Sequence, residues 1–230
     1  MTNKEKLPNG NIYEYLSNKQ NIIKFYSDLI DNAINKHIND EYLKDILTDY
    51  FHNKIPTYFY TTAASQSGKY HPKYSLGEGG LVRHTLSALT WYTRIKDLNI
   101  FDNSDLIGLS ENYINDIICT SILIHDTFKC GYTEVTYTVY SHPSIAANEF
   151  YKLANDYIIQ ISDESKSKSL SIILNYVCSA VESHMGKWGR IQPKNSIDKI
   201  VSLCDYLSAQ KVVDNMYDID SLDINKDFKV

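Results

Sequence analysis

The sequence predicts an all-α fold, a compact helical bundle with a helical extension at its N-terminal end. Apolar side chains recur every three or four residues in one segment after another, which is the pattern of helices that bury one face. Thr133 to Tyr140 is the one stretch with the Thr, Val and Tyr content of a strand, and one short strand cannot make a sheet alone. We therefore interpret that stretch as an extended connection or a small hairpin.

The N-terminal part of the chain is expected to form two helices. A polar stretch with a turn at Pro8 to Gly10 comes first, and amphipathic segments follow near residues 22–34 and 42–51. These two segments should pack against each other as a helical hairpin. Pro56 then interrupts the pattern ahead of the aromatic patch Tyr58-Phe59-Tyr60. We assign this patch to the core, because the basic residues that accompany a base-stacking surface are missing around it.

Five more helices are expected after an ordered, glycine-containing loop at residues 65–80. They are a helix from Gly80 to about Leu98, the apolar run Ile117 to Ile124, a helix that starts at His142-Pro143, a long helix that reaches His184 after a polar loop at 162–169, and a last helix that starts after Pro193. The acidic and polar tail from Tyr217 is expected to cover the surface or to fray.

Composition narrows the class of protein. A net charge of -5 without a long basic stripe argues against binding of long nucleic acids, and leaves short or monomeric phosphate substrates open. The four cysteines are far apart and form no C-x-x-C pair, so we expect free thiols in a reducing compartment. No apolar segment reaches the roughly 18 to 20 residues that span a bilayer, and no signal peptide opens the chain. We therefore expect a cytoplasmic protein without membrane contact.

The dipeptide His125-Asp126 is the strongest chemical signal. It closes the apolar run Ile117 to Ile124, which predicts a helix buried almost all round. A buried carboxylate is unfavourable by several kcal/mol or more unless something compensates it, and a metal ion that both side chains bind would do so. The alternative is a helix end at which polarity returns because the chain reaches the surface.

Other histidines and aspartates show the same pattern. His84 and His184 continue apolar helical faces, Asp205 lies four residues after the apolar Val201, and His142 begins a helix. Helical bundles hold one or two metals with inward histidines and carboxylates of this kind. Taken together, the residues favour a metal site over six unrelated core or surface positions.

The order His84, His125-Asp126, Asp205 resembles the HD-domain superfamily of metal-dependent phosphohydrolases. The segments GGLVRHT, from Gly79 to Thr85, and HDTFK, from His125 to Lys129, resemble most closely the HD domain of YhaM-like 3′–5′ exoribonucleases and related uncharacterised bacterial and phage proteins. The segment from Ser67 to Pro72 is similar to the lead-in of some of these relatives. The resemblance covers about residues 60–215, so we divide the chain into an N-terminal helical extension at 1–55, an HD domain at 56–215 and a C-terminal tail at 216–230.

The resemblance implies a role for each of the six residues. His84, His125, Asp126 and Asp205 would hold one metal, and Asp126 would bridge to a second metal held by His142 and His184. Two bridged cations supply a hydroxide near neutral pH and neutralise phosphoryl charge. His and Asp ligands suit Mn, Fe, Co, Ni and Zn alike, so the metal's identity stays open.

Several basic side chains are candidates for contacting the substrate's phosphate. Lys129 lies one helical turn beyond the dyad and is placed to act as a point charge; the alternative is a solvated surface lysine. Weaker candidates, each with surface exposure as its alternative, are Lys69, His71, Arg83, Lys187 and Arg190.

The expected function is metal-dependent hydrolysis of a phosphoester in a nucleotide or another small phosphorylated metabolite, as a mono- or diesterase, with Asp126 and Lys129 as catalytic residues. A nuclease acting on short oligonucleotides is one alternative. YhaM-like enzymes carry a nucleic-acid-binding OB domain, whereas the first sixty residues here are predicted to be helical. A non-catalytic module that binds a nucleotide is the other alternative.

Overall fold

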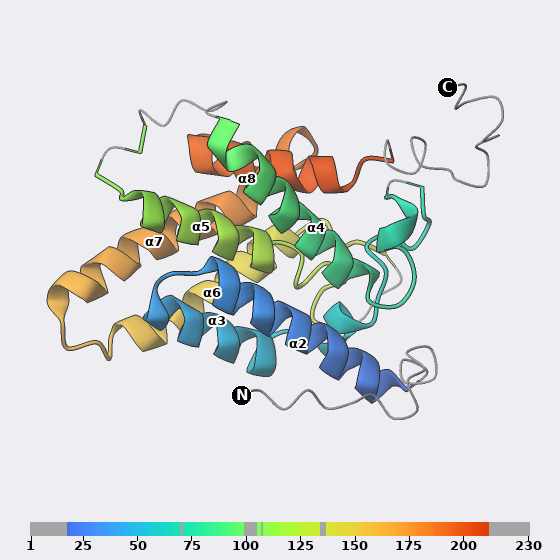
Figure 1. Cartoon of the computed structure of the whole chain (residues 1–230), viewed down its shortest axis with the longest axis horizontal. Coiled ribbons are helices and arrows are strands. Elements are labelled where there is room, and N and C mark those ends of the chain that lie inside the picture. The colour runs from blue at the N-terminus through green and yellow to red at the C-terminus, as the bar shows by residue number, and fades with distance from the viewer. Residues whose placement is uncertain (1–17, 70, 99–104, 107, 134–136, 212–230) are drawn as a thin grey trace, which may run out of the picture.

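The computed structural model describes residues 18–69, 71–98, 105–106, 108–133 and 137–211. These residues form seven α-helices and no strand, so the predicted all-α class is confirmed (Figure 1). The helices are α2 Lys19–His37, α3 Glu41–Asn53, α4 Gly80–Ile95, α5 Glu111–Ile124, α6 His142–Ile158, α7 Glu164–Ser183 and α8 Ser196–Ser208. Short 3-10 turns occur at Thr57–Tyr60, Lys73–Ser75, Lys96–Leu98 and Gly186–Trp188.

Helix α5 is the central element of the bundle. Every residue from Asp116 to Ile124 is buried, as its continuous apolar run predicts. It packs against α2, α4, α6, α7 and α8 (Figure 1). Because the other helices surround α5, a side chain that follows its last turn lies inside the molecule.

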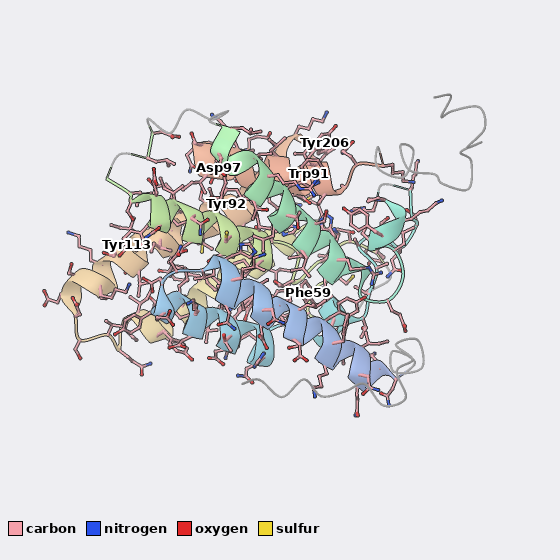
Figure 2. The ribbon with its side chains drawn as sticks, viewed as in Figure 1. Phe59, Trp91, Tyr92, Asp97, Tyr113 and Tyr206 are labelled. Carbon is pink, nitrogen blue, oxygen red and sulfur yellow. The ribbon has the colours of Figure 1, made fainter. Side chains whose placement is uncertain are left out.

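The two N-terminal helices share the core of the rest of the bundle. Tyr50 and Phe51 of α3 are completely or almost completely buried, and the Tyr50 ring meets the Phe150 ring of α6 edge to face at 5.3 Å. Phe51 packs on Phe59, which confirms that the patch from Tyr58 to Tyr60 is core; Phe59 is labelled in Figure 2. Helices α2 and α3 also contact each other, as expected for a hairpin.

The same N-terminal region braces the turn that follows α5. The Tyr50 hydroxyl lies 2.9 Å from the Thr127 hydroxyl, which itself donates to the Ile124 carbonyl at 2.8 Å. The Tyr58 hydroxyl donates to the Gly131 carbonyl at 2.6 Å. Tyr50 and Tyr58 therefore hold residues at both ends of the turn that follows Asp126. Both tyrosines precede residue 60, where the resemblance to the HD domain begins.

A buried carboxylate joins α5 to the connection between α2 and α3. Asp116 is fully buried and accepts hydrogen bonds from the backbone N–H groups of Asn39 and Asp40, each at 2.9 Å, and from the Asn39 side-chain amide at 2.8 Å. Together with the Asn115 side-chain amide at 3.3 Å, four donors compensate the desolvation of this carboxylate. Asp40 in turn caps the N-terminus of α3 and pairs with Lys166 of α7.

Two local expectations need correction or lie partly outside the described residues. The polar loop expected at 162–169 is mostly helix: α7 begins at Glu164, because Asp163 caps it by accepting from the Lys166 N–H at 3.0 Å. Within Thr133 to Tyr140, the described residues contain no strand, and the Val139 N–H donates to the Lys129 carbonyl at 2.8 Å. The turn at Pro8 to Gly10 and the tail from Tyr217 lie outside the described residues.

Among the helices that the structure describes, none combines the length and apolar character needed to cross a membrane.

We predict that Asp116→Ala destabilises the fold by about 3 kcal/mol, because buried N–H donors of Asn39 and Asp40 lose their acceptor. Asp45→Ala, at an exposed position of α3, is the control and should change the stability by less than about 0.5 kcal/mol. Urea unfolding followed by circular dichroism measures both. Equal midpoints for Asp116→Ala and the unsubstituted protein would contradict the role given to this carboxylate.

Candidate metal centre

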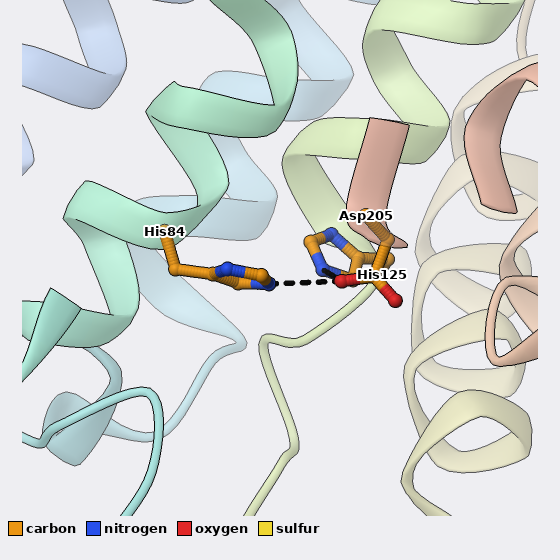
Figure 3. Close-up of side chains that lie close together, drawn as sticks. All are labelled: His84, His125 and Asp205. Carbon is orange, nitrogen blue, oxygen red and sulfur yellow. Dashed lines mark hydrogen bonds and ion pairs between the residues drawn. The ribbon is translucent and has the colours of Figure 1, made fainter. Parts of the chain in front are cut away.

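Four histidines and two aspartates meet near the ends of five helices. They come from five separate segments of the chain, which the packing of the helices brings together. They are His84 in the second turn of α4, His125 at the C-cap of α5 with Asp126 after it, His142 at the start of α6, His184 at the C-cap of α7, and Asp205 in the last turn of α8. Figure 3 shows three of them, His84, His125 and Asp205, with their polar atoms facing one another.

The Asp126 carboxylate lies between two pairs of imidazoles. Its Oδ2 atom is 3.5 Å from His84 Nε2 and 3.4 Å from His125 Nε2. Its Oδ1 atom is 3.0 Å from His142 Nε2 and 3.7 Å from His184 Nε2. The Asp126 side chain is 1% exposed. One oxygen therefore faces each pair of histidines.

Asp205 completes the first of these groups. Its Oδ1 atom lies 2.9 Å from His84 Nε2 and 3.6 Å from His125 Nε2 (Figure 3). The second group contains the His142 and His184 Nε2 atoms, which are 3.3 Å apart. The Asp205 side chain is 24% exposed, so this group reaches the surface of a cavity.

The orientation of each imidazole is set by a bond at its other nitrogen. The Nδ1 atoms of His125, His142 and His184 each lie 2.7 Å from the backbone carbonyl three residues earlier. A carbonyl only accepts, so these Nδ1 atoms carry the hydrogen. His84 Nδ1 lies 3.0 Å from the Ser208 hydroxyl, which donates its own hydrogen to the Asp205 carbonyl at 2.8 Å. In the neutral tautomer, all four Nε2 lone pairs then point into the cluster.

The cluster therefore consists of acceptors that face acceptors. Neutral imidazole Nε2 atoms and carboxylate oxygens repel at these distances unless protons or cations lie between them. His125 Nε2 and Asp126 Oδ1 are buried and have no hydrogen-bond partner. Three-ligand groupings occur at His84, His125 and Asp205 and at His125, Asp126 and His184, with ligand atoms within 4.8 Å of one another. Residues of this kind, at this spacing, fit a divalent transition metal.

The pKa shifts show how the charges balance without a metal. Burial lowers the pKa of His84, and it lowers the pKa of His184 to about 3. Burial also opposes charge on His125, but Asp126 and Asp205 outweigh it and raise the pKa of His125 to about 10. Burial opposes charge on Asp126 as well, yet Lys129 and His125 hold the pKa of this carboxyl well below its usual range. One proton on His125 and the Lys129 ammonium thus balance two carboxylates, and a bound metal would displace that proton.

Lys129 lies beside Asp126 rather than in free solvent. Its ammonium is 2.5 Å from Asp126 Oδ2, and its side chain is 11% exposed. The alternative of a solvated surface lysine does not describe this position. Lys129 also lines the cavity that opens onto the cluster, so it has access to a ligand there.

That cavity has a volume of about 750 Å³ and connects the cluster to the surface. Lys69 and His71 line it, as do four of the six cluster residues. The His71 ring packs edge-on against the His84 ring at 4.9 Å, and neither of its buried nitrogens has a hydrogen-bond partner. The remaining lining residues are Thr138, Met185, Trp188, Tyr206, Ala209, Gln210 and Lys211.

The structure gives Arg83 a structural position instead of a place in the cavity. Its guanidinium donates to the carbonyl oxygens of Tyr74, Leu76 and Glu78 and to the Tyr26 hydroxyl. Although Arg83 precedes His84, adjacent residues of a helix point in directions about 100° apart. Arg83 therefore fixes the loop before α4 and is not among the residues that line the cavity.

Lys187 and Arg190 also lie outside the cavity lining. The Lys187 ammonium is 4.6 Å from the Trp188 ring centroid, and the Arg190 guanidinium is 5.0 Å from the Tyr140 ring centroid. Both cations lie against aromatic rings at exposed positions.

Sequence reasoning missed Ser208, Trp188 and Tyr206. Ser208 follows Asp205 by three residues on the same helix face, so helical spacing from a candidate ligand was the available signal. Tyr206 directly follows Asp205, and Trp188 follows His184 by four residues. No pattern along the chain shows that these two rings meet.

We compared the chain with protein-family models, curated proteins and solved structures, and none of the three comparisons finds a match.

We predict that Ser208→Ala lowers the affinity for a divalent transition metal by about 10- to 100-fold, because His84 loses the partner that orients its ring. Isothermal titration with Mn²⁺ and with Co²⁺ measures the effect. Ser169→Ala is the control, since Ser169 makes a solvent-exposed hydrogen bond to the Ser165 carbonyl within α7. An unchanged affinity in Ser208→Ala would show that this hydroxyl does not support a metal ligand.

Proposed function

We propose that this protein is a metal-dependent phosphohydrolase of the HD-domain type, acting on phosphoesters of nucleotides or other small phosphorylated metabolites. The observation that carries the proposal is the position of Asp126. Its two oxygens face two separate pairs of imidazole Nε2 atoms, at 3.0 to 3.7 Å, in a buried cluster beside the Lys129 ammonium. That arrangement is suited to a carboxylate shared by two cations.

The residues divide into two sets of ligands under this proposal. His84, His125, Asp205 and one oxygen of Asp126 would hold one metal, and His142, His184 and the other oxygen of Asp126 would hold the second. When bound, divalent transition metals lower the pKa of a coordinated water and neutralise charge on a phosphoryl group. Mn, Fe, Co, Ni and Zn all suit these ligands.

The chain's own side chains provide the remaining requirements of hydrolysis. Lys129 brings a cation to the floor of the cavity, 2.5 Å from Asp126, where a phosphate oxygen of a substrate can share it. Asp126 keeps a negative charge at the centre of the site. The cavity of about 750 Å³ is within the size range of small-molecule sites and therefore favours a substrate of nucleotide size.

Two other functions each have one observation in their favour. Exposed aromatic side chains and the lysines Lys69 and Lys211 at the cavity would suit a nuclease that acts on short oligonucleotides. The positive charges of Lys129 and a protonated His125 balance the two carboxylates of the cluster. This balance would suit a non-catalytic module that binds a nucleotide without a metal.

We predict that Asp126→Asn lowers hydrolysis by about two orders of magnitude or more, because it removes the shared negative charge between the two ligand sets. Metal affinity should fall in parallel. The fold should survive, because asparagine keeps the size of the side chain and relieving a buried charge is often neutral or stabilising once the metals are gone. The measurement is the hydrolysis rate over a panel of nucleotides and cyclic nucleotides with Mn²⁺, Fe²⁺, Co²⁺, Ni²⁺ or Zn²⁺, with circular dichroism as the folding control.

Lys129→Ala provides the contrast to this variant. It should weaken substrate binding or turnover and leave the metal content intact, because Lys129 is not among the ligands. If the unsubstituted protein hydrolyses no phosphoester with any of these metals but still binds a nucleotide, the enzyme proposal fails and the binding module replaces it.

We also predict two metal equivalents at saturation, and one in His184→Ala, because the second ligand set then keeps only His142 and one oxygen of Asp126. Elemental analysis after removal of free metal gives the number. His52→Ala is the control, since His52 lies on α3 and pairs with Asp31 at an exposed position. A single equivalent in the unsubstituted protein would reduce the proposed centre to one metal.

A further inference from the structure

Two large aromatic rings stand at the outer part of the cavity and take no part in the metal cluster. The Trp188 and Tyr206 rings stack with centroids 5.8 Å apart and planes 18° from parallel. Both line the cavity, yet 54% of Trp188 and 43% of Tyr206 remain exposed. We call this pair the aromatic platform. Figure 2 labels Tyr206 on α8 at the edge of the molecule.

The chain places the platform next to the cluster through covalent neighbours of two candidate ligands. Tyr206 directly follows Asp205 on α8, and Trp188 ends the short 3-10 turn that follows His184. Asp126, at 1% exposure, lies at the inner end of the cavity, and the half-exposed platform therefore lies toward its outer end. A ligand in this cavity can therefore contact both the cluster and the platform.

The loop that carries Trp188 is held in place by several bonds. Gly186 has a φ of +54°, a conformation that favours glycine, and a Cβ there would lie 2.7 Å from Ser202 Oγ. The Gln192 side-chain amide donates to the Gly186 carbonyl at 2.9 Å and to the Gly189 carbonyl at 3.1 Å. The Tyr140 hydroxyl donates to the Trp188 carbonyl at 3.2 Å. The backbone under the tryptophan is thus positioned before any ligand binds.

Basic side chains accompany the platform. The Lys187 ammonium lies 4.6 Å from the Trp188 ring centroid, and Arg190 lies over Tyr140 at 5.0 Å. Lys69 and Lys211 line the same cavity. Partly exposed aromatic side chains next to cations are the features with which proteins bind the bases and phosphates of nucleotides.

We propose that Trp188 and Tyr206 form a nucleobase subsite, which stacks the base of a nucleotide whose phosphate lies at the His and Asp cluster. The inference rests on the proposed function for the position of the phosphate, and it narrows the substrate class from small phosphorylated metabolites to those with a planar heteroaromatic base. Stacking on a ring face is tolerant of base identity, so the subsite accepts purines and pyrimidines.

Binding to the platform is measured first by fluorescence, without any need for turnover. The chain has two tryptophans, Trp91 and Trp188, so Trp91→Phe leaves Trp188 as the single reporter. Adenosine, guanosine, cytidine and uridine 5′-monophosphates should quench this signal, and ribose 5-phosphate, which lacks the base, should not. Tyr206→Ala in the same background should weaken nucleotide binding about 5- to 100-fold. Tyr151→Ala removes a ring that is 45% exposed on α6 and is absent from the cavity lining, and it should leave binding unchanged.

Hydrolysis provides the second measurement. Trp188→Ala should lower kcat/KM for nucleoside monophosphates about 5- to 100-fold and leave kcat/KM for ribose 5-phosphate unchanged, and Trp188→Phe should restore most of the loss. An equal decrease for both substrates would overturn the subsite, as would equal quenching by ribose 5-phosphate or no quenching by any nucleotide.

The two proposals can fail separately. If nucleotides quench Trp188 selectively but no phosphoester is hydrolysed, the proposed hydrolase is wrong and the nucleobase subsite stands. If nucleotides and ribose 5-phosphate are hydrolysed equally well, without selective quenching and without an effect of Trp188→Ala, the hydrolase stands and the subsite is wrong.

Discussion

The structure depends on a carboxylate that is buried among acceptors. Asp126 is 1% exposed, and its oxygens face the Nε2 atoms of four imidazoles. The Nδ1 atom of each ring, on the side away from Asp126, is held by a carbonyl or by a hydroxyl. Such a group is costly unless protons, Lys129 or metal cations neutralise it. Asp116, ten residues earlier, shows the other solution, because its carboxylate accepts from backbone and amide N–H groups and needs no cation. Asp126 therefore indicates a site for a cation, whereas Asp116 has a structural role and connects two parts of the bundle.

Helix ends supply most of the geometry of the cluster. His125 and His184 are C-caps, and the Nδ1 atom of each lies against a carbonyl of the last turn of its own helix. Carbonyls in the last turn of a helix lack the regular N–H partner four residues later, so they are available as acceptors for a side chain. Two histidines thereby acquire a fixed ring orientation from their own helices, whereas His84 needs Ser208 from α8 for the same purpose. The cluster therefore combines local and long-range constraints.

The N-terminal helices and the 3-10 turn after α3 support the site through residues next to the cluster. Tyr50 bonds to Thr127, Tyr58 bonds to Gly131, and Asp116 connects α5 to the start of α3. These bonds hold both ends of α5 and the turn that carries Asp126 and Lys129. What the sequence presents as an extension at 1–55 thus shares the core of the bundle, in the part that the structure describes. Trp188 and Tyr206 line the same cavity; Tyr206 follows Asp205 on α8, and Trp188 belongs to the short turn after His184.

The sequence by itself determined the all-α class and the order of the helices, because apolar residues recur every three or four positions. It also indicated five His and Asp residues that end or interrupt apolar faces, and His142 at the start of a helix. The same reasoning did not predict the helix cap at Asp163. Because of this cap, α7 begins inside the segment 162–169, whose polar composition suggests a loop. Only the tertiary structure decided that Arg83 turns away to the loop before α4, that Ser208 orients His84, and that Trp188 meets Tyr206. Each of these contacts joins side chains through the crossing of separate elements or through a folded loop. No repeat along the chain encodes such a crossing, since it depends on how all the helices pack at once.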